Sequence, residues 1–131
     1  MIKVRFITHN GLYKECEASC INCLSSDGWR GILPNHMPIV LMLPISRLEV
    51  KNGNKKDQYA IGGGMIYFEN NEANILLDSI EHQDDIDLER ASSSKQRAER
   101  RLSEQNPNYD LKRAEISLKR ALNRISVCNY K

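Results

Sequence analysis

In the last third of the sequence, Ile86-Asp87-Leu88-Glu89-Arg90-Ala91 is followed by Leu118-Lys119-Arg120-Ala121-Leu122-Asn123-Arg124. Both segments have the residue spacing of helices. Between them lies Asn106-Pro107, and the residue before a proline is disfavoured in a helix, so this pair indicates a turn. The sequence therefore predicts an antiparallel two-helix hairpin over residues 85–131.

The basic side chains of this hairpin are predicted to gather at one place. Asp87, Arg90 and Arg97 lie along one stripe of the first helix, because offsets of three, four and seven share a face. Arg90 and Arg124 lie 17 residues on either side of the proline in the turn, and Arg97 and Arg120 lie nearer to it. Four guanidinium groups around one carboxylate predict a bound polyphosphate, which arginine binds bidentately. The alternative is an ordinary solvated helix face.

Composition places the positive charge in the same region. The chain has 131 residues, 40% hydrophobic and 6% aromatic, which suits one domain or a small domain with an appendage. Its net charge is +2, yet residues 95–124 contain nine Lys or Arg against four Asp or Glu. No apolar run approaches the roughly 20 residues of a membrane-spanning helix, and no signal or transit segment is recognisable. We expect the protein to work in the compartment where it is made.

The cysteines do not predict a metal site. Cys16, Cys20, Cys23 and Cys128 include a single Cys-x-x-Cys pair, with no second pair and no histidine at ligand spacing. Reduced, mostly packed thiols are expected. The sequence also shows no nucleophile with an adjacent base, so we do not expect an enzyme.

Residues 1–84 are predicted to form a small antiparallel β-sandwich domain. Residues 2–7 alternate apolar and polar side chains, and turn signals such as Asn52-Gly53-Asn54 separate short strands. After residue 78 the period becomes helical, and Asp84 or Asp85 is the expected helix cap. The fold class is therefore α+β. The other predicted strands are 15–24, 39–43, 47–51, 58–61, 65–68 and 74–77.

Two loops of the strand domain could carry function. Gly62-Gly63-Gly64 lacks the Gly-Lys-Ser/Thr ending of a phosphate-binding loop, so it predicts a bend or bulge between strands. Residues 31–38 contain two prolines that fix a rigid, exposed segment, and His36 has no catalytic partner beside it in sequence. We interpret this segment as a structural or docking loop.

Three stretches together resemble the epsilon subunit family of bacterial F-type ATP synthases. They are Gly31-Ile32-Leu33-Pro34-x-His36-x-Pro38, Gly62-Gly63-Gly64 and Asp85-Ile86-Asp87-x-x-Arg90-Ala91, and the resemblance covers essentially the whole chain. It implies a sandwich of about ten strands with a helical hairpin, and a non-catalytic role in the central stalk. The implied partners are the gamma subunit, the c-ring and the alpha/beta catalytic subunits. The implied location is the cytoplasmic face of the bacterial plasma membrane, held peripherally through the complex.

The resemblance also implies a regulatory ligand. Bacillus-like members bind ATP through the motif Ile/Leu-Asp-x-x-Arg-Ala with supporting arginines on both helices, and ATP favours the folded hairpin over an extended form that inhibits ATP hydrolysis. No cofactor is required, and a role for magnesium stays open. The residues that match this ATP site are Glu81, Ile86, Asp87, Arg90, Ala91, Arg97, Arg120 and Arg124.

A docking contact with the c-ring or gamma is implied for the loop that contains Asp27, Trp29 and His36. Here the sequence departs from the family pattern. The family usually has an acidic or polar residue followed by leucine, whereas this chain has Trp29-Arg30.

One rival interpretation from another class is a nucleic-acid-binding module, in which the basic hairpin follows a phosphate backbone. The basic stripe has no interleaved aromatic side chains on which bases could stack, and Asp87 lies within it. Both features disfavour nucleic acid as the partner.

Overall fold

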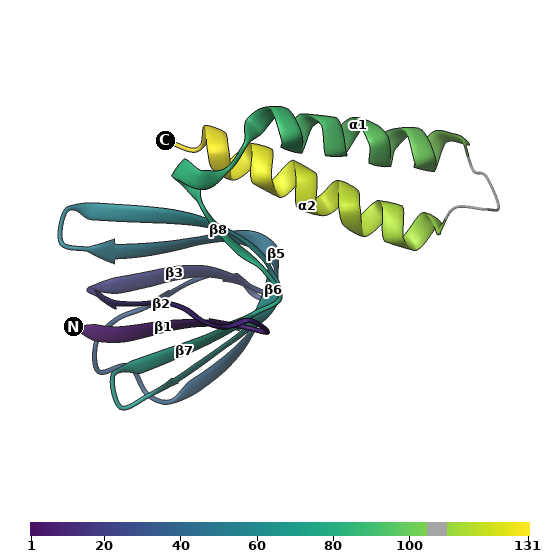
Figure 1. Cartoon of the computed structure of the whole chain (residues 1–131). Helices are drawn as coiled ribbons and strands as arrows, with labels where there is room; N and C mark the ends of the chain where they lie inside the picture. The colour runs from purple at the N-terminus through teal and green to yellow at the C-terminus, as the bar shows by residue number, and fades with distance from the viewer. Residues whose placement is uncertain (105–109) are drawn as a thin grey trace. The chain divides into compact units, whose positions relative to one another are not determined.

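The computed structural model describes residues 1–104 and 110–131, and the chain divides into two units, Met1–His82 and Gln83–Lys131. The first unit is built of strands and the second of helices (Figure 1). This is the predicted α+β arrangement. The predicted turn at Asn106-Pro107 lies outside the described residues.

The first unit, in which every residue is described, contains eight strands that form one sheet in the order β2-β1-β7-β6-β5-β3-β4, with β8 paired to β6. Neighbouring strands in this unit are antiparallel, except for β1 and β7, which run parallel. The prediction of a purely antiparallel sandwich did not include this parallel pair. The strands are β1 (Ile2–Thr8), β2 (Gly11–Ala18), β3 (Cys20–Ser25), β4 (Gly28–Ile32), β5 (Ile39–Asn52), β6 (Lys55–Glu69), β7 (Glu72–Leu77) and β8 (Ile80–His82).

β5 is long because it runs through both layers of the sandwich. Before Pro44 its inward-facing residues have odd numbers, as at Leu43, whereas Leu48 faces inward after it. A change of phase of this kind bends a strand so that it leaves one layer and joins the other. The prediction of separate strands at 39–43 and 47–51 is therefore wrong, because Pro44 marks a corner within one strand.

Gly62-Gly63-Gly64 makes the same corner on β6, so the strands predicted at 58–61 and 65–68 are also one strand. Gly64 has a φ of +155°, and a Cβ there would lie 2.0 Å from the carbonyl oxygen of Leu76. Only glycine allows this approach. The predicted bend is confirmed. The described unit has eight strands, whereas the family resemblance implies about ten.

Two further strand predictions are wrong near the amino end. The strand expected at 15–24 is divided at Ser19 into β2 and β3, and the backbone N–H of Ser19 donates to the Lys51 carbonyl at 2.7 Å. Residues 28–32, expected as a turn and loop, form β4, which pairs with β3. β2 and β4 are consequently the two edges of the sheet.

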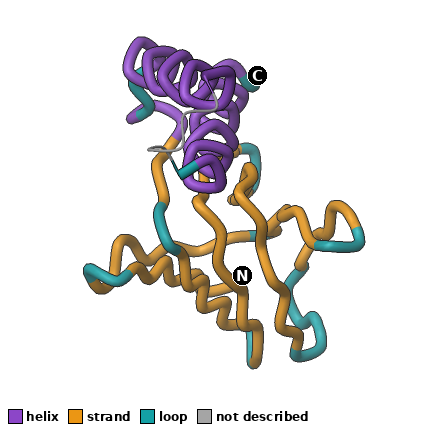
Figure 2. Tube along the Cα trace, turned by 90° about the vertical axis from the view of Figure 1, so that its right-hand side faces the viewer, coloured by secondary structure: helices purple, strands orange, loops and turns teal. Residues whose placement is uncertain are grey.

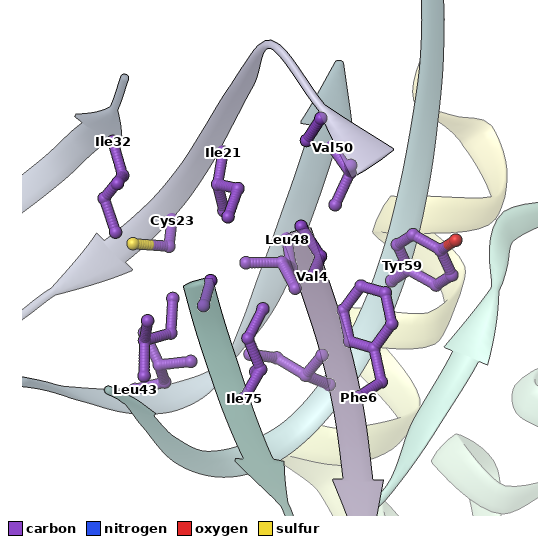
Figure 3. Close-up of a cluster of buried hydrophobic side chains, with 14 of the residues drawn as sticks. Val4, Phe6, Ile21, Cys23, Ile32, Leu43, Leu48, Val50, Tyr59 and Ile75 are labelled. Carbon is purple, nitrogen blue, oxygen red and sulfur yellow. The ribbon is translucent and has the colours of Figure 1, made fainter. Parts of the chain in front are cut away.

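The core of the sandwich lies between its layers and is built of large apolar side chains (Figure 3). Phe6, Leu48, Tyr59 and Ile75 come from four different strands and are 1% exposed or less. The rings of Phe6 and Tyr59 are 5.1 Å apart between centroids. Cys23 is buried among them, and burial raises the pKa of its thiol to about 11. This thiol stays protonated at neutral pH, as expected for a packed cysteine.

The second unit contains a short 3-10 helix, η1 (Gln83–Asp85), followed by α1 (Leu88–Glu104) and α2 (Leu111–Asn129). The two α-helices lie side by side and antiparallel (Figures 1 and 2). Asp84 and Asp85 lie in η1, so the prediction that one of them caps the first helix is wrong. In the described part of the chain, neither helix is long and apolar enough to cross a membrane.

The contact between α1 and α2 is made by small side chains. The buried residues Ala91 and Ala98 of α1 are seven apart, as are Ala114 and Ala121 of α2, and each of the four is 2% exposed or less. Small residues on both faces let two helices approach closely. Leu122, next to the buried Ala121, is 44% exposed.

Candidate functional site: a basic helical hairpin

The predicted Ile-Asp-x-x-Arg-Ala motif spans the start of α1. The Asp87 carboxylate accepts a hydrogen bond from the backbone N–H of Arg90 at 3.1 Å, and its carbonyl accepts from the Ala91 N–H at 3.0 Å. Asp87 is therefore the N-cap of the helix, and the Asp-x-x-Arg spacing is the spacing of a cap and the N–H that it satisfies. The geometry of the cap accounts for this part of the motif.

Ile86 and Ala91 occupy the positions of a hydrophobic staple, one residue before the cap and four residues after it. Ile86 is 8% exposed and Ala91 is 2% exposed. Ala91 also belongs to the alanine contact between the helices. Three of the four motif residues thus have a structural role, whereas the side chain of Arg90 is exposed and forms no ion pair with a described carboxylate.

The predicted grouping of arginines around a carboxylate needs a correction. The Asp87 carboxylate is used by the helix cap, and within residues 83–104 and 110–131 it forms no ion pair with an arginine. Arg90 and Arg120 are exposed and likewise form no ion pair with a described carboxylate. Arg97 is exposed and donates from Nη2 to the Ser94 hydroxyl at 3.1 Å. Arg124, on α2, is half-buried.

Arg90 of α1 and Arg124 of α2 lie toward the same end of the hairpin, where the acidic residues Asp84, Asp85 and Glu89 are also found. Arg90 adjoins the buried Ala91 of α1, and Arg124 lies one turn beyond the buried Ala121 of α2. The first N–H groups of α1 add the partial positive charge of a helix amino end. An anion there would meet guanidinium groups from both helices.

A polar hollow lies further along the hairpin, with a volume of about 230 Å³. Its α1 residues are Ser94, Arg97, Ala98 and Arg101, and Ser117 comes from α2. Of these residues, Arg97 lies on the stripe predicted from the sequence. The spacing 94, 97, 98 and 101 marks one helix face and could have identified Arg101, whereas Ser117 becomes a neighbour only when the helices pair.

Glu81 belongs to the first unit. It lies on β8 opposite Ala60 of β6, and its side chain is half-buried.

The residues predicted for docking occupy different settings in the first unit. Asp27 is exposed in the turn before β4, where its carboxylate lies 3.8 Å from the Arg30 guanidinium. Trp29 is 54% exposed on β4, and the guanidinium of Arg47 lies 4.8 Å from its ring centroid. Trp29 is thus a strand residue in a cation–π contact instead of a loop residue.

His36 fixes the proline-containing loop to the sandwich. Its ring meets Phe68 edge-on at 6.0 Å, and its Nδ1 donates to the Met37 carbonyl at 2.7 Å. The loop is also held by Asn35 and Asn71, whose Nδ2 donates to the Asn35 Oδ1 at 2.8 Å. These contacts explain the rigid loop that the prolines predicted.

Several hydrogen-bonded polar side chains lie on the outer face of β3, β5 and β6. The nearly buried Glu49 accepts from Gln58 Nε2 at 3.0 Å, from Asn22 Nδ2 at 3.2 Å and from Arg47 Nη1 at 3.3 Å. Burial opposes ionisation of Glu49, but the hydrogen bonds from Gln58 and Asn22, with the charges of Lys51 and Arg47, outweigh it and lower its pKa.

Comparison with known families matches both units. Residues 1–83 match the β-sandwich domain of the ATP synthase delta/epsilon chain, and residues 84–129 match its long α-helix domain. The chain belongs to the ATP synthase delta/epsilon chain family. The ATP synthase epsilon chain of Lactobacillus helveticus is 41% identical over 138 residues, covering 100% of this chain and 94% of that protein. The epsilon chain of Bacillus cytotoxicus is 40% identical over 128 residues, covering 98% and 96%.

A solved member of an ATP synthase has the same fold. A chain in the structure of the Euglena gracilis mitochondrial ATP synthase, described as OSCP/F1/c-ring in rotational state 1, superposes with a TM-score of 0.77. It is 25% identical, and the match covers 90% of this chain and 75% of that one. As an ATP synthase epsilon-type chain, the protein is a non-catalytic subunit of the complex, which favours the stalk-subunit interpretation of the hairpin over the nucleic-acid interpretation.

Proposed function

We propose that this epsilon-type chain works in the central stalk at the cytoplasmic face of the bacterial plasma membrane, and that its hairpin restrains ATP hydrolysis until ATP binds to it. Support comes from the epsilon chains of Bacillus and Lactobacillus, which it matches over nearly its whole length. The solved relative belongs to a structure described by its F1 and c-ring parts. In this proposal the sandwich docks on the gamma subunit and the c-ring, and the open hairpin reaches the alpha/beta catalytic subunits.

The observation that carries the ATP proposal is that each helix has an exposed arginine that forms no ion pair with a described carboxylate. Arg90 and Arg120 are exposed and unpaired with any described carboxylate, and the Asp87 carboxylate is used by the helix cap. Guanidinium groups bind phosphate oxygens in a fixed fork and keep their charge. ATP held by arginines of α1 and α2 would contact the closed hairpin more fully than the open one.

The closed state then gains free energy from the ligand alone. A ligand that binds one state only stabilises it by about 2.7 kcal/mol at a hundredfold excess over its dissociation constant. We infer that the alanine contact between the helices contributes a similarly small free energy, so that a shift of this size decides the population. Falling ATP would release the hairpin to inhibit hydrolysis.

Calorimetric titration of the purified chain with ATP tests this proposal. The wild-type chain should bind one ATP, and Arg90→Ala should abolish or strongly weaken the binding. Arg100→Ala is the matched control, since Arg100 is an exposed α1 residue that pairs with Glu104 at 3.1 Å. Titrations with and without magnesium show whether ATP binding requires the ion. A titration with a single-stranded oligonucleotide tests the alternative that the hairpin binds nucleic acid. If the chain does not bind ATP, the proposal that ATP regulates the hairpin is wrong.

The assembled complex tests the regulatory half. At saturating ATP, a complex that carries Arg90→Ala should hydrolyse ATP more slowly than wild type, because its hairpin stays in the inhibitory state. The two complexes should converge when ATP is scarce. Equal hydrolysis at all ATP concentrations would contradict regulation by the hairpin.

We further propose that the outer face of β2, β1, β7, β6 and β5 is the gamma docking surface. Cross-strand pairing places five apolar residues in one row, Leu12, Ile7, Leu76, Met65 and Met42. Leu12, Leu76 and Met42 are 58%, 41% and 69% exposed. An apolar row across five strands is the kind of patch that a protein partner covers. It contrasts with the polar face around Glu49.

The row also offers a place for an anchoring side chain. A hollow of about 310 Å³ adjoins it, lined by Ile7, Thr8, His9, Leu76, Leu77 and Asp78. Interfaces draw most of their energy from a few side chains seated in such hollows. Leu76→Glu should abolish binding to the isolated gamma subunit, whereas Leu111→Glu, at a 40% exposed site at the start of α2, should not. Equal binding by both variants would place the gamma contact elsewhere.

A further inference from the structure

The side chain of Gln83 connects the beginning of the helical unit to its end. Its Nε2 donates to the Val127 carbonyl at 2.8 Å and also to the Tyr130 carbonyl, which lie 44 and 47 residues further along the chain. Gln83 is the first residue of the helical unit and of η1, whereas Val127 lies in the last turn of α2 and Tyr130 is its C-cap. One side chain that precedes α1 therefore contacts the carboxyl end of α2.

The acceptors are backbone carbonyls at a helix end. The last four C=O groups of an α-helix have no N–H partner within the helix itself. At the end of α2, the N–H of Tyr130 donates to the Val127 carbonyl at 3.2 Å, and Gln83 provides a second donor to the same oxygen. A carbonyl oxygen has two lone pairs and can accept both hydrogen bonds. Gln83 thus completes the carboxyl end of α2 from outside that helix.

These hydrogen bonds lie at the end of the hairpin where the chain does not connect the two helices. α1 ends at Glu104 and α2 begins at Leu111, so the covalent connection joins them there. The start of α1 and the end of α2 lie together at the opposite end, which we call the free end (Figure 1). Between the two ends, the buried contact is made mostly of alanines. A hairpin of this kind can begin to separate at its free end.

The segment that carries Gln83 has little apolar surface of its own. None of the three residues of η1 is buried. Its internal hydrogen bond, from the Ile86 N–H to the Gln83 carbonyl, is long at 3.4 Å. The bond from Gln83 to the Val127 carbonyl is shorter and partly buried, and Val127 itself is fully buried. Loss of a donor to a partly buried carbonyl is costly, because water replaces it incompletely.

We propose that Gln83 is a latch that fastens the free end of the closed hairpin by donating to the last carbonyls of α2. Opening of the hairpin separates η1 from the end of α2 and breaks both hydrogen bonds, so the latch favours the closed state without any ligand. Its regulatory consequence rests on the proposed function. A weaker latch leaves fewer chains closed, and more ATP is then needed to close the same fraction.

Three variants of Gln83 test whether hydrogen-bond donation is what fastens the hairpin. Gln83→Ala removes the side chain. Gln83→Glu keeps its size, but an ionised carboxylate only accepts hydrogen bonds and would face two carbonyl oxygens. Gln83→Lys keeps a donor, and a cation is favoured at the carboxyl end of a helix. Gln96→Ala is the matched control, because Gln96 is an exposed glutamine of α1 outside the latch.

Hydrogen exchange of the full chain, followed by NMR without nucleotide, measures the latch. In Gln83→Ala and Gln83→Glu, amides in the last turn of α2 should exchange about tenfold faster, as expected for the loss of two hydrogen bonds. Gln83→Lys and Gln96→Ala should stay within about twofold of wild type, since neither loses the donor. Amides of β1 to β8 should not change in any variant, which shows that the sandwich stays folded.

The assembled complex relates the latch to regulation. With Gln83→Glu, the ATP concentration that half relieves the inhibition of hydrolysis should rise by up to about tenfold, and saturating ATP should still relieve it. Gln83→Lys should need about the same ATP concentration as wild type. An unchanged ATP requirement in Gln83→Glu, together with faster exchange at the end of α2, would contradict the regulatory consequence.

Two results would overturn the latch itself. One is wild-type exchange at the end of α2 in both Gln83→Ala and Gln83→Glu. The other is equally fast exchange in Gln83→Lys, which would show that the fit of the glutamine matters and that donation does not. Both results are obtained without nucleotide, so they do not depend on ATP binding. Loss of ATP binding in Arg90→Ala would still support the proposed function, so the two failures are distinguishable.

Discussion

The sandwich core and the helix contact of this chain are built from different materials. The sandwich buries large side chains completely, among them Phe6, Tyr59 and Phe68, whereas the buried residues between the helices are mostly alanines. Burial contributes roughly 0.8 kcal/mol per CH₂ group, so large side chains stabilise far more than alanines do. The sandwich has the core of a permanent domain. The hairpin has a contact made mostly of small side chains, as the proposed ligand-dependent opening requires.

The largest expected effect is in the sandwich. Phe6→Ala should lower the free energy of unfolding by about 3–5 kcal/mol, because it leaves a cavity beside Tyr59 in a fully packed core. Chemical denaturation measures the change. Leu12→Ala, at a 58% exposed site, is the control and should change stability by less than about 0.5 kcal/mol. A small effect of Phe6→Ala would show that the sandwich is as loosely held as the hairpin.

A second variant acts on the hairpin alone. Ala121→Leu places a large side chain where 1% of the alanine is exposed, so it should force the helices apart at a cost of about 1–3 kcal/mol. Hydrogen exchange should become faster in α1 and α2 and stay unchanged in β1 to β8. Leu122→Ala, at the adjacent exposed position, is the control. Faster exchange in the sandwich as well would contradict the independence of the two regions.

Variants of Asp87 separate the capping role of its side chain from any role of its negative charge. Their expected effect on stability is smaller. Asp87→Ala should destabilise α1 by about 1 kcal/mol through loss of the cap, and Asp87→Asn, which can still accept the Arg90 N–H, should cost little. Helix content by circular dichroism and exchange at the start of α1 report both. Asp110→Ala provides a reference, because Asp110 caps α2 with the same 3.1 Å bond. Equal losses for the Asn and Ala variants would show that the charge of Asp87 matters more than its cap.

The smallest effect concerns the polar outer face of the sandwich. The folded-state pKa of Glu49 is lowered, so its contribution to stability is present above its unfolded pKa and is lost as pH falls through the folded pKa. As the pH falls from about 5 to about 3, through the usual pKa range of carboxyl groups, the wild type should lose more stability than Glu49→Gln. Denaturant midpoints across this range measure the difference. Parallel pH curves for the two proteins would contradict a lowered pKa.

The fold class can be predicted from the sequence because each unit has its own period. The strand boundaries within 39–51 and 58–68 were wrong because Pro44 and Gly62-Gly63-Gly64 are signals that end most strands, and here they bend two long ones. Alternation read in short windows cannot show that the inward phase changes across a corner within one strand. The position of β4 was missed for a related reason, since its residues are mostly exposed and give little alternation.

Seven of the eight residues predicted for the ATP site lie in the helical unit, whereas Glu81 lies on β8 of the first unit, and their arrangement depends on contacts that spacing does not reveal. Helical spacing placed Asp87 on the arginine stripe, yet the cap turns its carboxylate to the Arg90 N–H. Ser117 joined the hollow through the pairing of α1 with α2, which follows from the alanine register. That register is the part of the site that a single sequence leaves open.

Hydrogen exchange of the full chain with and without saturating ATP tests the central claim, that the hairpin is a ligand-dependent structure attached to a permanent domain. At a hundredfold excess of ATP over its dissociation constant, amides of α1 and α2 that exchange through hairpin opening should slow about a hundredfold. Amides of the sandwich should not change, and Arg90→Ala should remove the effect. Unchanged exchange in the helices at saturation, or equal slowing in both regions, would contradict the claim.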